Sequence, residues 1–290
     1  MISNMDVVVI FNGLGNQMSQ YAFYLAKNKN DDRCKVIFSS SSVNEHNGSE
    51  LDRLFGVKYG NGILEKILRI IYKYYEGIPR IRKIFHILGV RVIRENRNYD
   101  YDLKYLQKSP KFGLNFYVGG WHSERYYRLV KKEIKKTFSF DVENEDEDFL
   151  TLFNKIRDDK KSVSVHVRKG DYVGHPDFDG IANKEYYERS MRYWREKLGN
   201  PRFYIFSNNI ESCKETFDSK ECTFVNLNEN SKAWRDMAMM SACKHHIIAN
   251  STFSWWGAWL SDTKEETVCP VRFLNDTITK DIYPDKWIKL

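Results

Sequence analysis

The sequence predicts an α/β protein whose sheets are parallel. Near its start, the apolar run Val7–Phe11 leads directly into a glycine turn, and apolar residues at helical spacing follow as far as Ala26. Beyond residue 159, short β-branched and aromatic runs alternate with helical patterns. Strands that alternate with helices of about 10–15 residues are typical of βαβ units, which form parallel sheets. The first strand, turn and helix have the order that opens a doubly wound sheet.

The first half of the chain continues this pattern. Val36–Phe38 and Asn115–Val118 are short, largely apolar runs that fit buried strands. The second of them leads into the turn Gly119–Gly120 and a helix from about Ser123 to Lys136. The expected order is therefore again strand, turn and helix.

The second half repeats the pattern more regularly. Its strands are expected at Val163–Val167, Phe203–Phe206, Thr223–Leu227 and Ile247–Ala249. Helices are expected through residues 149–156, over 184–198, up to 217, over 232–243 and from 253 onward. The acidic stretch 141–148 indicates a surface connection whose end caps the first of these helices. We place the domain boundary after the helix that follows this stretch, which gives domains of residues 1–158 and 159–290.

The composition favours anionic partners other than nucleic acid. The 290 residues carry 46 Lys and Arg against 39 Asp and Glu, and the formal net charge is +7. A positive surplus attracts anionic ligands or surfaces. The acidic residues are interspersed with the basic ones, and no zinc finger, RNA-binding aromatic motif or basic heptad helix occurs. Nucleic acid is therefore not expected as a partner.

Cysteine usage and hydropathy predict a cytoplasmic protein without a metal site. The cysteine count of 5 is odd and no CxxC pair occurs, so neither a disulfide framework nor a zinc site is expected. The first residues lack the basic segment and apolar run of a signal peptide. No apolar run approaches the ~20 residues that span a bilayer.

The segment from His166 to Tyr172 is the strongest candidate for a ligand site. Charged side chains at the carboxyl end of a buried strand are costly unless they face a ligand. His166 and Arg168 lie on one face of that strand. An arginine suits a phosphate because its planar fork donates two hydrogen bonds. The alternative is a structural pair, with His166 bonded to backbone and Arg168 paired with Asp171.

Two further strand-to-helix turns are candidate sites for anions or sugars. Gly13 and Gly15 open the first helix, where backbone N–H groups can bind an anion and where Asn16 and Gln17 add amides. This turn lacks the third glycine and the acid of a dinucleotide fingerprint, so a plain turn is the alternative. At residues 250–254, small polar residues precede a helix with tryptophans, and the alternative is ordinary N-capping over a tryptophan core.

Other segments have both a functional and a structural interpretation. Asp236 lies near a helix start, where it either complements the helix dipole or accepts two N–H donors from a guanine. His122 and Glu124 follow a turn, where they either meet an acceptor sugar or belong to a capping box started by Ser123. Residues 63–94 carry eight Lys and Arg against two acidic residues. They form either a solvated helix pair packed on the first domain or a surface for an anionic membrane, at whose inner face the protein would then be peripheral.

Together these motifs resemble glycosyltransferase family 11, the α-1,2-fucosyltransferases. The family's GLGNQ turn, its HxRxGDY motif, a later Ser-Asn motif, the final signature and a C-terminal tail all have counterparts in this chain. In chain order these are Asn12–Gln17, His166–Tyr172, Ser207–Asn208, residues 236–256 and residues 282–287. The matches cover almost the whole chain in the family's order.

The resemblance implies a GT-B-like fold, in which two Rossmann-type domains face an interdomain cleft. The donor would be GDP-L-fucose, bound by the C-terminal domain. Fucose would pass with inversion to the 2-hydroxyl of a terminal galactose, without a metal or other cofactor. The basic composition and the lack of a signal peptide suggest a bacterial cytoplasmic protein, whose acceptor would be a unit of a surface polysaccharide such as O-antigen or capsule, carried on a lipid.

The resemblance also implies roles for individual residues. Arg168 would neutralise the leaving GDP, with His166 and Asp171 as the other catalytic residues. The donor would be bound by Asn12, Gly13, Gly15, His166, Arg168, Ser207, Asn208, Asp236, Asn250, Ser251, Thr252, Phe253 and Ser254. The acceptor would be bound by Asn16, Gln17, His122, Glu124 and Asp177. The general base stays open between Asp171, Asp177, Asp179 and His122.

Other functions remain as alternatives. A fucosyltransferase of another linkage, α-1,6 or with a protein acceptor, shares the His-x-Arg strand but not the GLGNQ turn. A non-catalytic protein would bind the GDP-sugar without transferring it. A membrane adaptor that uses residues 63–94 would leave the anion sites at the helix starts unexplained.

Overall fold

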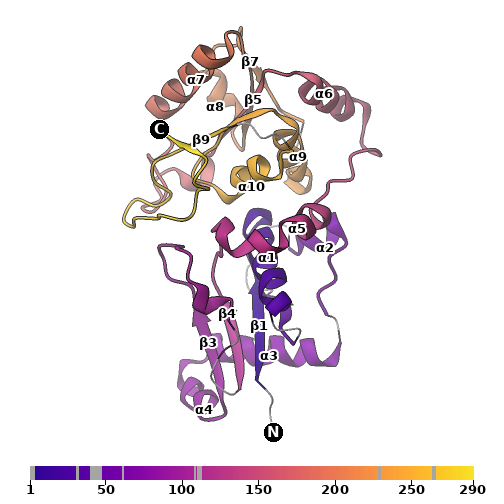
Figure 1. Cartoon of the computed structure of the whole chain (residues 1–290), viewed down its shortest axis with the longest axis vertical. Coiled ribbons are helices and arrows are strands. Elements are labelled where there is room, and N and C mark those ends of the chain that lie inside the picture. Colours follow the sequence, from indigo (N-terminus) through magenta and orange to yellow (C-terminus); the bar gives the residue numbers. More distant parts are fainter. Residues whose placement is uncertain are drawn as a thin grey trace. The chain divides into compact units, whose positions relative to one another are not determined.

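The computed structural model describes residues 4–30, 33–39, 48–60, 62–107, 109, 113–227, 230–262 and 266–290. The chain divides into two compact units, Met1–Ser139 and Phe140–Leu290. Each unit has one sheet, and every strand pair in both sheets is parallel, as predicted. Figure 1 shows the helices and strands of each unit.

The N-terminal unit contains a sheet with the strand order β2-β1-β4-β3. Its strands are β1 (Met5–Ile10), β2 (Lys35–Phe38), β3 (Val90–Arg94) and β4 (Leu114–Val118). Val8 of β1 pairs with Val36 on one side and with Tyr117 on the other. The central strand β1 is buried on both faces, which fits its nearly continuous apolar sequence.

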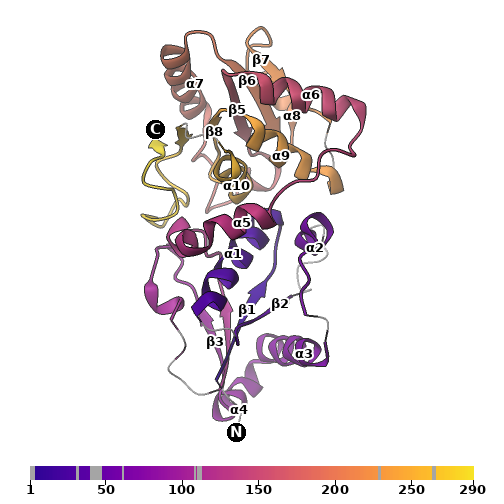
Figure 2. The same ribbon diagram turned by 45° about the vertical axis from the view of Figure 1, so that its right-hand side comes forward.

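Helices cover both faces of this sheet (Figure 2). They are α1 (Leu14–Asn30), α2 (Glu50–Phe55), α3 (Ile63–Gly77), α4 (Arg82–Ile87) and α5 (Lys131–Thr137), with 3₁₀ turns η2 (Pro79–Ile81), η3 (Leu103–Tyr105) and η4 (Glu124–Val130). On one face, Phe23 of α1 stacks on Trp121 with ring centroids 4.1 Å apart. On the other, Leu68 and Tyr75 of α3 join the core formed by Val7 and Val9.

A buried ion pair ties α1 to β1. Lys27 Nζ lies 2.9 Å from Asp6 Oδ2, and both side chains are buried. The same ammonium donates to the carbonyls of Tyr105 and Gln107 and lies 4.0 Å from the centroid of the Tyr117 ring. The charge is therefore compensated on several sides, as a buried charge must be.

The C-terminal unit contains a sheet with the strand order β10-β9-β8-β5-β6-β7. Its strands are β5 (Ser162–Val167), β6 (Arg202–Ser207), β7 (Cys222–Phe224), β8 (His245–Ile247), β9 (Thr267–Cys269) and β10 (Ile288–Lys289). The order reverses between β5 and β8, because the chain runs from β5 outward through β6 to β7 and then returns to β8 on the other side of β5. Ligands of open α/β sheets bind at the carboxyl ends of the strands, next to the point where the strand order reverses.

The helices of this unit lie on both faces of its sheet. α7 (Lys184–Leu198) and α8 (Ile210–Lys214) pack on Val163, Val165 and Val167, so these valines anchor the core. On the opposite face, α10 (Thr252–Leu260) brings the ring of Phe253 to 5.7 Å from His166. α9 (Trp234–Ala242) packs between α10 and α6 (Glu147–Asp158).

The boundary between the units lies earlier than the predicted one at residues 158 and 159. Helix α6 belongs to the C-terminal unit because it packs on α9, with Arg235 5.0 Å from the centroid of the Phe149 ring. Arg235 also forms ion pairs with Glu145 and Asp146. Asp146 caps α6 by accepting from the amide of Phe149 at 3.0 Å, so the predicted capping is confirmed.

Some elements differ from those expected. Residues 63–94 end in strand β3 rather than in a helix pair, because Val90, Val92 and neighbouring residues pair with β4. The helix expected from Ser123 to Lys136 begins as the 3₁₀ turn η4 and becomes α-helical only at α5. β9, β10 and α2 have no counterpart among the predicted elements.

Two expectations from composition concern the whole chain. The five cysteines are buried and free. Within the described ranges, no helix has the length and apolarity needed to cross a membrane.

Candidate active site

A cavity of about 610 Å³ opens at the carboxyl edge of the C-terminal sheet. It is lined by residues from the ends of β5, β6 and β7 and from the starts of α8, α9 and α10: His166, Arg168, Ser207, Asn208, Asn209, Ile210, Glu211, Val225, Asn226, Ala233, Asp236 and Phe253. These segments meet beside the reversal of strand order, where ligands of α/β proteins bind. The structure thus brings together predicted residues from separate motifs of the sequence.

His166 is buried beneath this cavity and remains uncharged at neutral pH. The residue is only 3% exposed, and its Nδ1 has no hydrogen-bond partner among the described residues. Burial, and secondly the nearby Arg168, lowers the pKa of His166 to about 3. Its backbone carbonyl accepts from the Tyr187 hydroxyl at 2.9 Å. The imidazole of this lining residue is therefore a neutral group.

Arg168 is oriented by its neighbours in the HxRxGDY motif. Its Nη2 lies 2.9 Å from the Asp171 carboxylate, and its guanidinium lies 5.3 Å from the centroid of the Tyr172 ring. The side chain of Arg168 is 28% exposed and that of Asp171 is 58% exposed. Arg168 Nε is buried without a hydrogen-bond partner in the part of the chain that the structure describes. The predicted ion pair exists, and it leaves donors of the guanidinium for an anion.

Asn208 clamps the loop that carries Arg168. Its Oδ1 accepts from the amide of Lys169 at 2.9 Å, and its Nδ2 donates to the Lys169 carbonyl at 3.2 Å. Gly170 has φ +60°, and a Cβ there would lie 2.8 Å from Asn208 Nδ2. Glycine is needed at this position both for the left-handed backbone and for the approach of Asn208. Part of the Asn208 amide is thus committed to the loop.

The turn at residues 250–254 is mainly structural. Asn250 Nδ2 donates to the carbonyls of Phe178 and Phe273 at 3.3 and 3.2 Å. Ser251 Oγ caps α10 by accepting from the amide of Phe253, and Ser254 Oγ donates to the Ser251 carbonyl. The N-capping interpretation therefore describes Ser251, whereas Ser254 bonds back to the first turn of the helix. Thr252 is only partly buried, and Phe253 lines the cavity.

The loop that follows Tyr172 is fixed to the same unit. The Tyr172 hydroxyl donates to the Asn250 carbonyl at 3.2 Å. Asn275 holds the loop by three hydrogen bonds. Its backbone N–H donates to the Asp177 carbonyl, and its side-chain Nδ2 donates to the carbonyls of Pro176 and Asp179. The Asp179 carboxylate accepts from the amide of Gly174 at 2.9 Å. Asp177 is partly buried and lies outside the lining of the cavity.

In the N-terminal unit, the GLGNQ turn lies at the carboxyl end of β1. Asn12 has φ 64°, a left-handed backbone that is uncommon outside glycine. Gln17 is fully buried: its Nε2 donates to the carbonyls of Asn12 and Gly48 at 2.7 Å, and its Oε1 accepts from the amide of Glu50. The Gln17 side chain therefore fixes the turn by hydrogen bonds, and it is too buried to contact an acceptor.

The other turn residues differ in exposure. Gly15 is buried in α1, whereas Asn12, Gly13 and Asn16 are partly exposed at the carboxyl edge of the sheet. The partly exposed three are the members of this turn that a ligand can reach.

A glutamate with a buried carboxylate shapes the neighbouring turn after β4. Glu95 Oε2 accepts from the amides of Gly120 and Trp121 at 2.8 and 2.7 Å. These bonds favour the carboxylate, but burial outweighs them and raises the pKa of Glu95 to about 8. Trp121 has φ 54°. Sequence reasoning missed Glu95, because it placed a helix rather than a strand before this residue.

The predicted acceptor residues near this turn are less accessible than expected. His122 is 5% exposed, its Nδ1 lies 3.1 Å from Ser19 Oγ, and burial lowers its pKa to about 3. A Cβ on Gly120 would lie 2.3 Å from His122 Nε2, so the imidazole occupies the space above that glycine. Glu124 begins η4 and is partly buried. A buried imidazole with so low a pKa is a poor general base.

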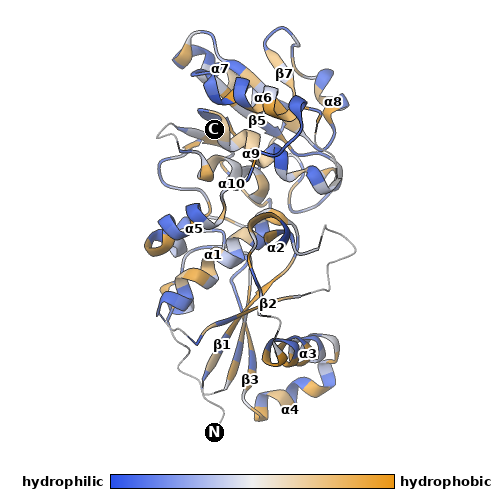
Figure 3. Ribbon diagram, turned by 90° about the vertical axis from the view of Figure 1, so that its right-hand side faces the viewer, coloured by the Kyte–Doolittle hydropathy of each residue, from blue (hydrophilic) through white to orange (hydrophobic). Residues whose placement is uncertain are grey.

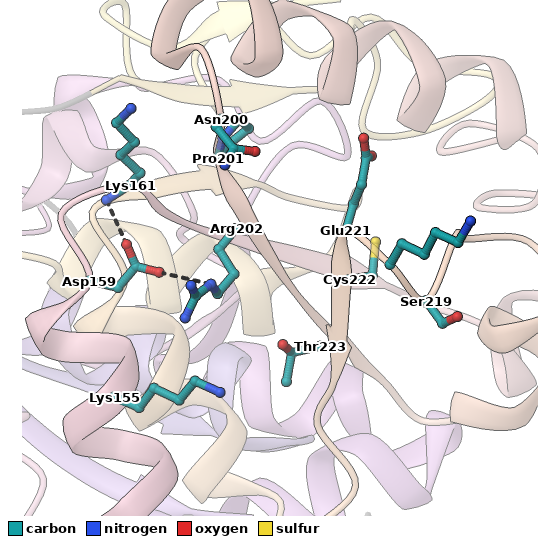
Figure 4. A pocket seen from close by; sticks show the side chains of 11 residues that line it. Lys155, Asp159, Lys161, Asn200, Pro201, Arg202, Ser219, Glu221, Cys222 and Thr223 are labelled. Atoms are coloured by element: carbon teal, nitrogen blue, oxygen red, sulfur yellow. Dashed lines mark hydrogen bonds and ion pairs between the residues drawn. The ribbon is translucent and has the colours of Figure 1, made fainter.

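A second cavity, of about 510 Å³, lies at the amino ends of β5, β6 and β7 (Figure 4). Its charges are partly paired: Arg202 Nε lies 3.6 Å from Asp159 Oδ2, and the amide of Lys161 donates to Asp159 Oδ1 at 2.9 Å. It contains none of the predicted site residues. Since ligands bind at the carboxyl edge of such sheets, we assign the other cavity as the candidate active site.

Two Rossmann-type units with parallel sheets are the architecture of the GT-B class of glycosyltransferases. The solved structure of a point mutant of Arabidopsis thaliana FUT1 in complex with GDP shares this fold. It superposes with a TM-score of 0.51 at 13% identity and covers 96% of this chain and 75% of the other. The model of Glycosyl transferase family 11 matches residues 68–290. The chain belongs to this family.

Two bacterial relatives match the chain over nearly its whole length. The chain is 33% identical to the Alpha-1,2-colitosyltransferase of Escherichia coli, over 99% of each chain. It is 28% identical to the O-antigen biosynthesis glycosyltransferase WbnK of Escherichia coli, over 96% of this chain and 98% of the relative. The predicted family and fold class are confirmed, whereas the predicted cleft between the domains stays a prediction.

Proposed function

We propose that this glycosyltransferase moves L-fucose from GDP-L-fucose to the 2-hydroxyl of a terminal galactose. The observation that carries the proposal is the cavity at the end of β5, which Arg168 and the neutral His166 line together. A guanidinium next to neutral donors suits a nucleoside diphosphate. The name of the colitosyltransferase relative supports the α-1,2 linkage.

In the proposed reaction, the bond between the sugar carbon and the diphosphate oxygen breaks, and its electron pair stays on GDP. The sugar carbon becomes oxocarbenium-like, and the 2-hydroxyl oxygen of the acceptor forms the new bond from the opposite face. Arg168 stabilises the charge that develops on the leaving diphosphate. Because a fixed cation occupies this position, we propose that the transfer needs no metal.

The other residues in and beside the cavity divide into those that contact the donor and those that position Arg168. Asp236 offers a carboxylate at the cavity wall, which suits the two N–H donors of a guanine edge. His166 and Ser207 complete the donor contacts. Asp171 and Asn208 are assigned as positioning residues, because they hold Arg168 and its loop. For the acceptor proton we propose a carboxylate of the loop that follows Tyr172, Asp177 or Asp179.

We propose an acceptor from a surface polysaccharide, carried on a lipid. The names of the two bacterial relatives, one of them an O-antigen biosynthesis enzyme, support this class of acceptor. Asn12, Gly13 and Asn16 are the partly exposed residues of the N-terminal unit that we assign to the sugars.

A second donor is favoured by one observation. The relative with 33% identity is a colitosyltransferase, so a colitosyl donor is the alternative to GDP-L-fucose. Colitose lacks one ring hydroxyl of fucose. An enzyme that hydrogen-bonds this hydroxyl would reject the deoxygenated sugar strongly, whereas an apolar contact would not.

The role of Arg168 is tested by Arg168→Ala. We expect transfer to fall by about 10²–10³, because one charged contact to the leaving group is lost. The matched control is Arg202→Ala, which removes an arginine from the cavity at the opposite edge of the same sheet. Turnover and GDP affinity are measured for both folded variants. Near-normal turnover of Arg168→Ala, or an equal loss in Arg202→Ala, would contradict the assignment.

A further inference from the structure

Large apolar side chains are concentrated on the outer surface of α3 and α4. Ile63 is 80% exposed and Ile87 is 85% exposed. Seven further members of the same stretch are exposed: Leu64, Ile67, Ile70, Tyr74, Ile78, Ile84 and Leu88. Exposed apolar residues elsewhere in the described chain are separated from one another along the sequence. So many exposed apolar side chains within one stretch point to an interaction site.

Helix α3 has two apolar faces. Leu68 and Tyr75 are buried against the sheet of the N-terminal unit. Ile63, Ile67, Ile70 and Tyr74 recur at the spacing i, i+4, i+7, i+11, which places them in a second stripe. At about 100° per residue, this stripe lies roughly 120° around the helix from the buried one. The structure therefore explains the first apolar face by packing and leaves the second in contact with solvent.

Cations border the exposed stripe. Lys66 and Lys73 follow one another at i, i+7 along its edge, and Arg80 and Lys83 continue the positive charge into α4. These four side chains are exposed and make no ion pair with other described residues. Glu76, an acidic residue of this stretch, is paired with Arg94. Figure 3 shows the resulting mixture of apolar and polar residues on both helices.

We propose that this surface, residues 63–88, docks on the anionic face of a phospholipid bilayer. Isoleucines flanked by uncompensated lysines and arginines match both parts of such a surface, the acyl boundary and the negative headgroups. A second copy of the chain fits less well, since a symmetric pairing would bring the same uncompensated cations together. Helices with an apolar stripe bordered by cations lie in the plane of such a membrane surface.

This inference is independent of donor identity, and it adds a location to the proposed function. An enzyme held at an anionic bilayer meets a lipid-carried acceptor at high local concentration. That consequence rests on the proposed function, whereas the binding itself does not.

The test is co-sedimentation of the full chain with lipid vesicles. Vesicles of phosphatidylethanolamine and phosphatidylglycerol should bind it, vesicles of phosphatidylcholine alone should not, and added salt should weaken binding. Lys66→Gln with Lys73→Gln should lower the partition coefficient by about 25-fold, at roughly fivefold per cation. Ile63→Ser with Ile67→Ser should lower it by about tenfold per residue.

Matched control variants distinguish binding through this surface from nonspecific binding to the vesicles. Lys132→Gln with Lys160→Gln removes exposed cations elsewhere, and Leu129→Ser with Ile278→Ser removes exposed apolar side chains elsewhere. Both controls should bind like the unchanged chain.

Three results would overturn the proposal. The first is that the unchanged chain binds no anionic vesicle, and the second is that the control variants weaken binding as much as the test variants do. The third is a dimer, detected by light scattering, that the isoleucine variant dissociates. GDP affinity, measured in parallel, reports on the proposed function separately.

Discussion

At the residue scale, the position of Arg168 depends on groups that do not themselves touch the donor in our account. Asn208 holds the backbone of Lys169 from both sides, and Gly170 supplies the backbone geometry that permits this. The fixed loop thus limits the conformations of the Arg168 side chain. Such preorganisation is what electrostatic stabilisation of a leaving group requires.

Gly170→Ala should therefore reduce turnover strongly while it lowers the free energy of unfolding only slightly. The new Cβ would displace Asn208 and shift the loop, and a misplacement of about 1 Å can reduce a rate about 10²-fold. Gly199→Ala is the matched control, because Gly199 also has positive φ but has no atom within 4 Å of the new Cβ. Both variants should lose about 1 kcal/mol of unfolding free energy. Equal turnover in the two variants would argue against the clamp.

Glu95 should make the stability of the protein depend on pH. Its pKa is raised to about 8 in the folded state from an ordinary value of 4.5. The folded state therefore binds the proton more tightly, and stability is full below the ordinary pKa and is lost as pH rises toward 8. The loss has an upper bound of about 4–5 kcal/mol.

The comparison that checks this is the melting temperature of Glu95→Gln and of the unchanged chain between about pH 5 and pH 8. Glutamine can keep the acceptor for the two backbone amides but cannot ionise. The unchanged chain should lose stability relative to the variant as pH rises. Parallel melting curves would show that Glu95 is not the titrating group.

At the element scale, the buried pair of Lys27 and Asp6 connects α1 to the central strand. Lys27→Met should cost about 3–5 kcal/mol of unfolding free energy, because the Asp6 carboxylate is left buried without its cation. Lys29→Met is the matched control, since its ammonium is bonded to an exposed carbonyl, that of Leu129, and its effect should stay within about 0.5 kcal/mol. Denaturant unfolding measures both, and similar values would contradict the role given to the pair.

Hydrophobic periodicity predicted most elements correctly, and its failures have physical reasons. The strands at Val163–Val167 and Phe203–Phe206 are nearly those observed, because buried parallel strands have continuous apolar sequences. β3 was missed because it is an edge strand whose two arginines interrupt its apolar residues. β8 starts at His245 and His246, polar residues whose burial depends on partners such as Ser164, far away in the sequence.

The sequence could predict which residues gather in the candidate site, but not which of them contact a ligand and which hold the backbone. His166, Arg168 and Asp236 do meet in one cavity. Gln17 and Asn250, which were predicted as contacts, instead bond backbone carbonyls from other parts of the chain. A polar side chain looks the same in a sequence whether it binds a ligand or a loop, and only tertiary contacts distinguish the two.

At the scale of the whole molecule, each unit presents its candidate functional residues at the carboxyl edge of a parallel sheet. In the C-terminal unit this edge carries the cavity with Arg168, and in the N-terminal unit it carries the turns of Asn12 and Gly120. The surplus of positive charge expected to attract anions is used in two places in our account. One is the donor cavity, and the other is the surface of α3 and α4.

The most direct test of the central claim is the linkage of the product. The chain is incubated with GDP-L-fucose and a panel of β-galactosides, and NMR determines which galactose hydroxyl carries the new sugar. We predict fucose on the 2-hydroxyl in the α configuration, formed with inversion of the donor. Transfer to another hydroxyl, or binding of GDP without transfer to any galactoside or from any related GDP-sugar, would contradict it.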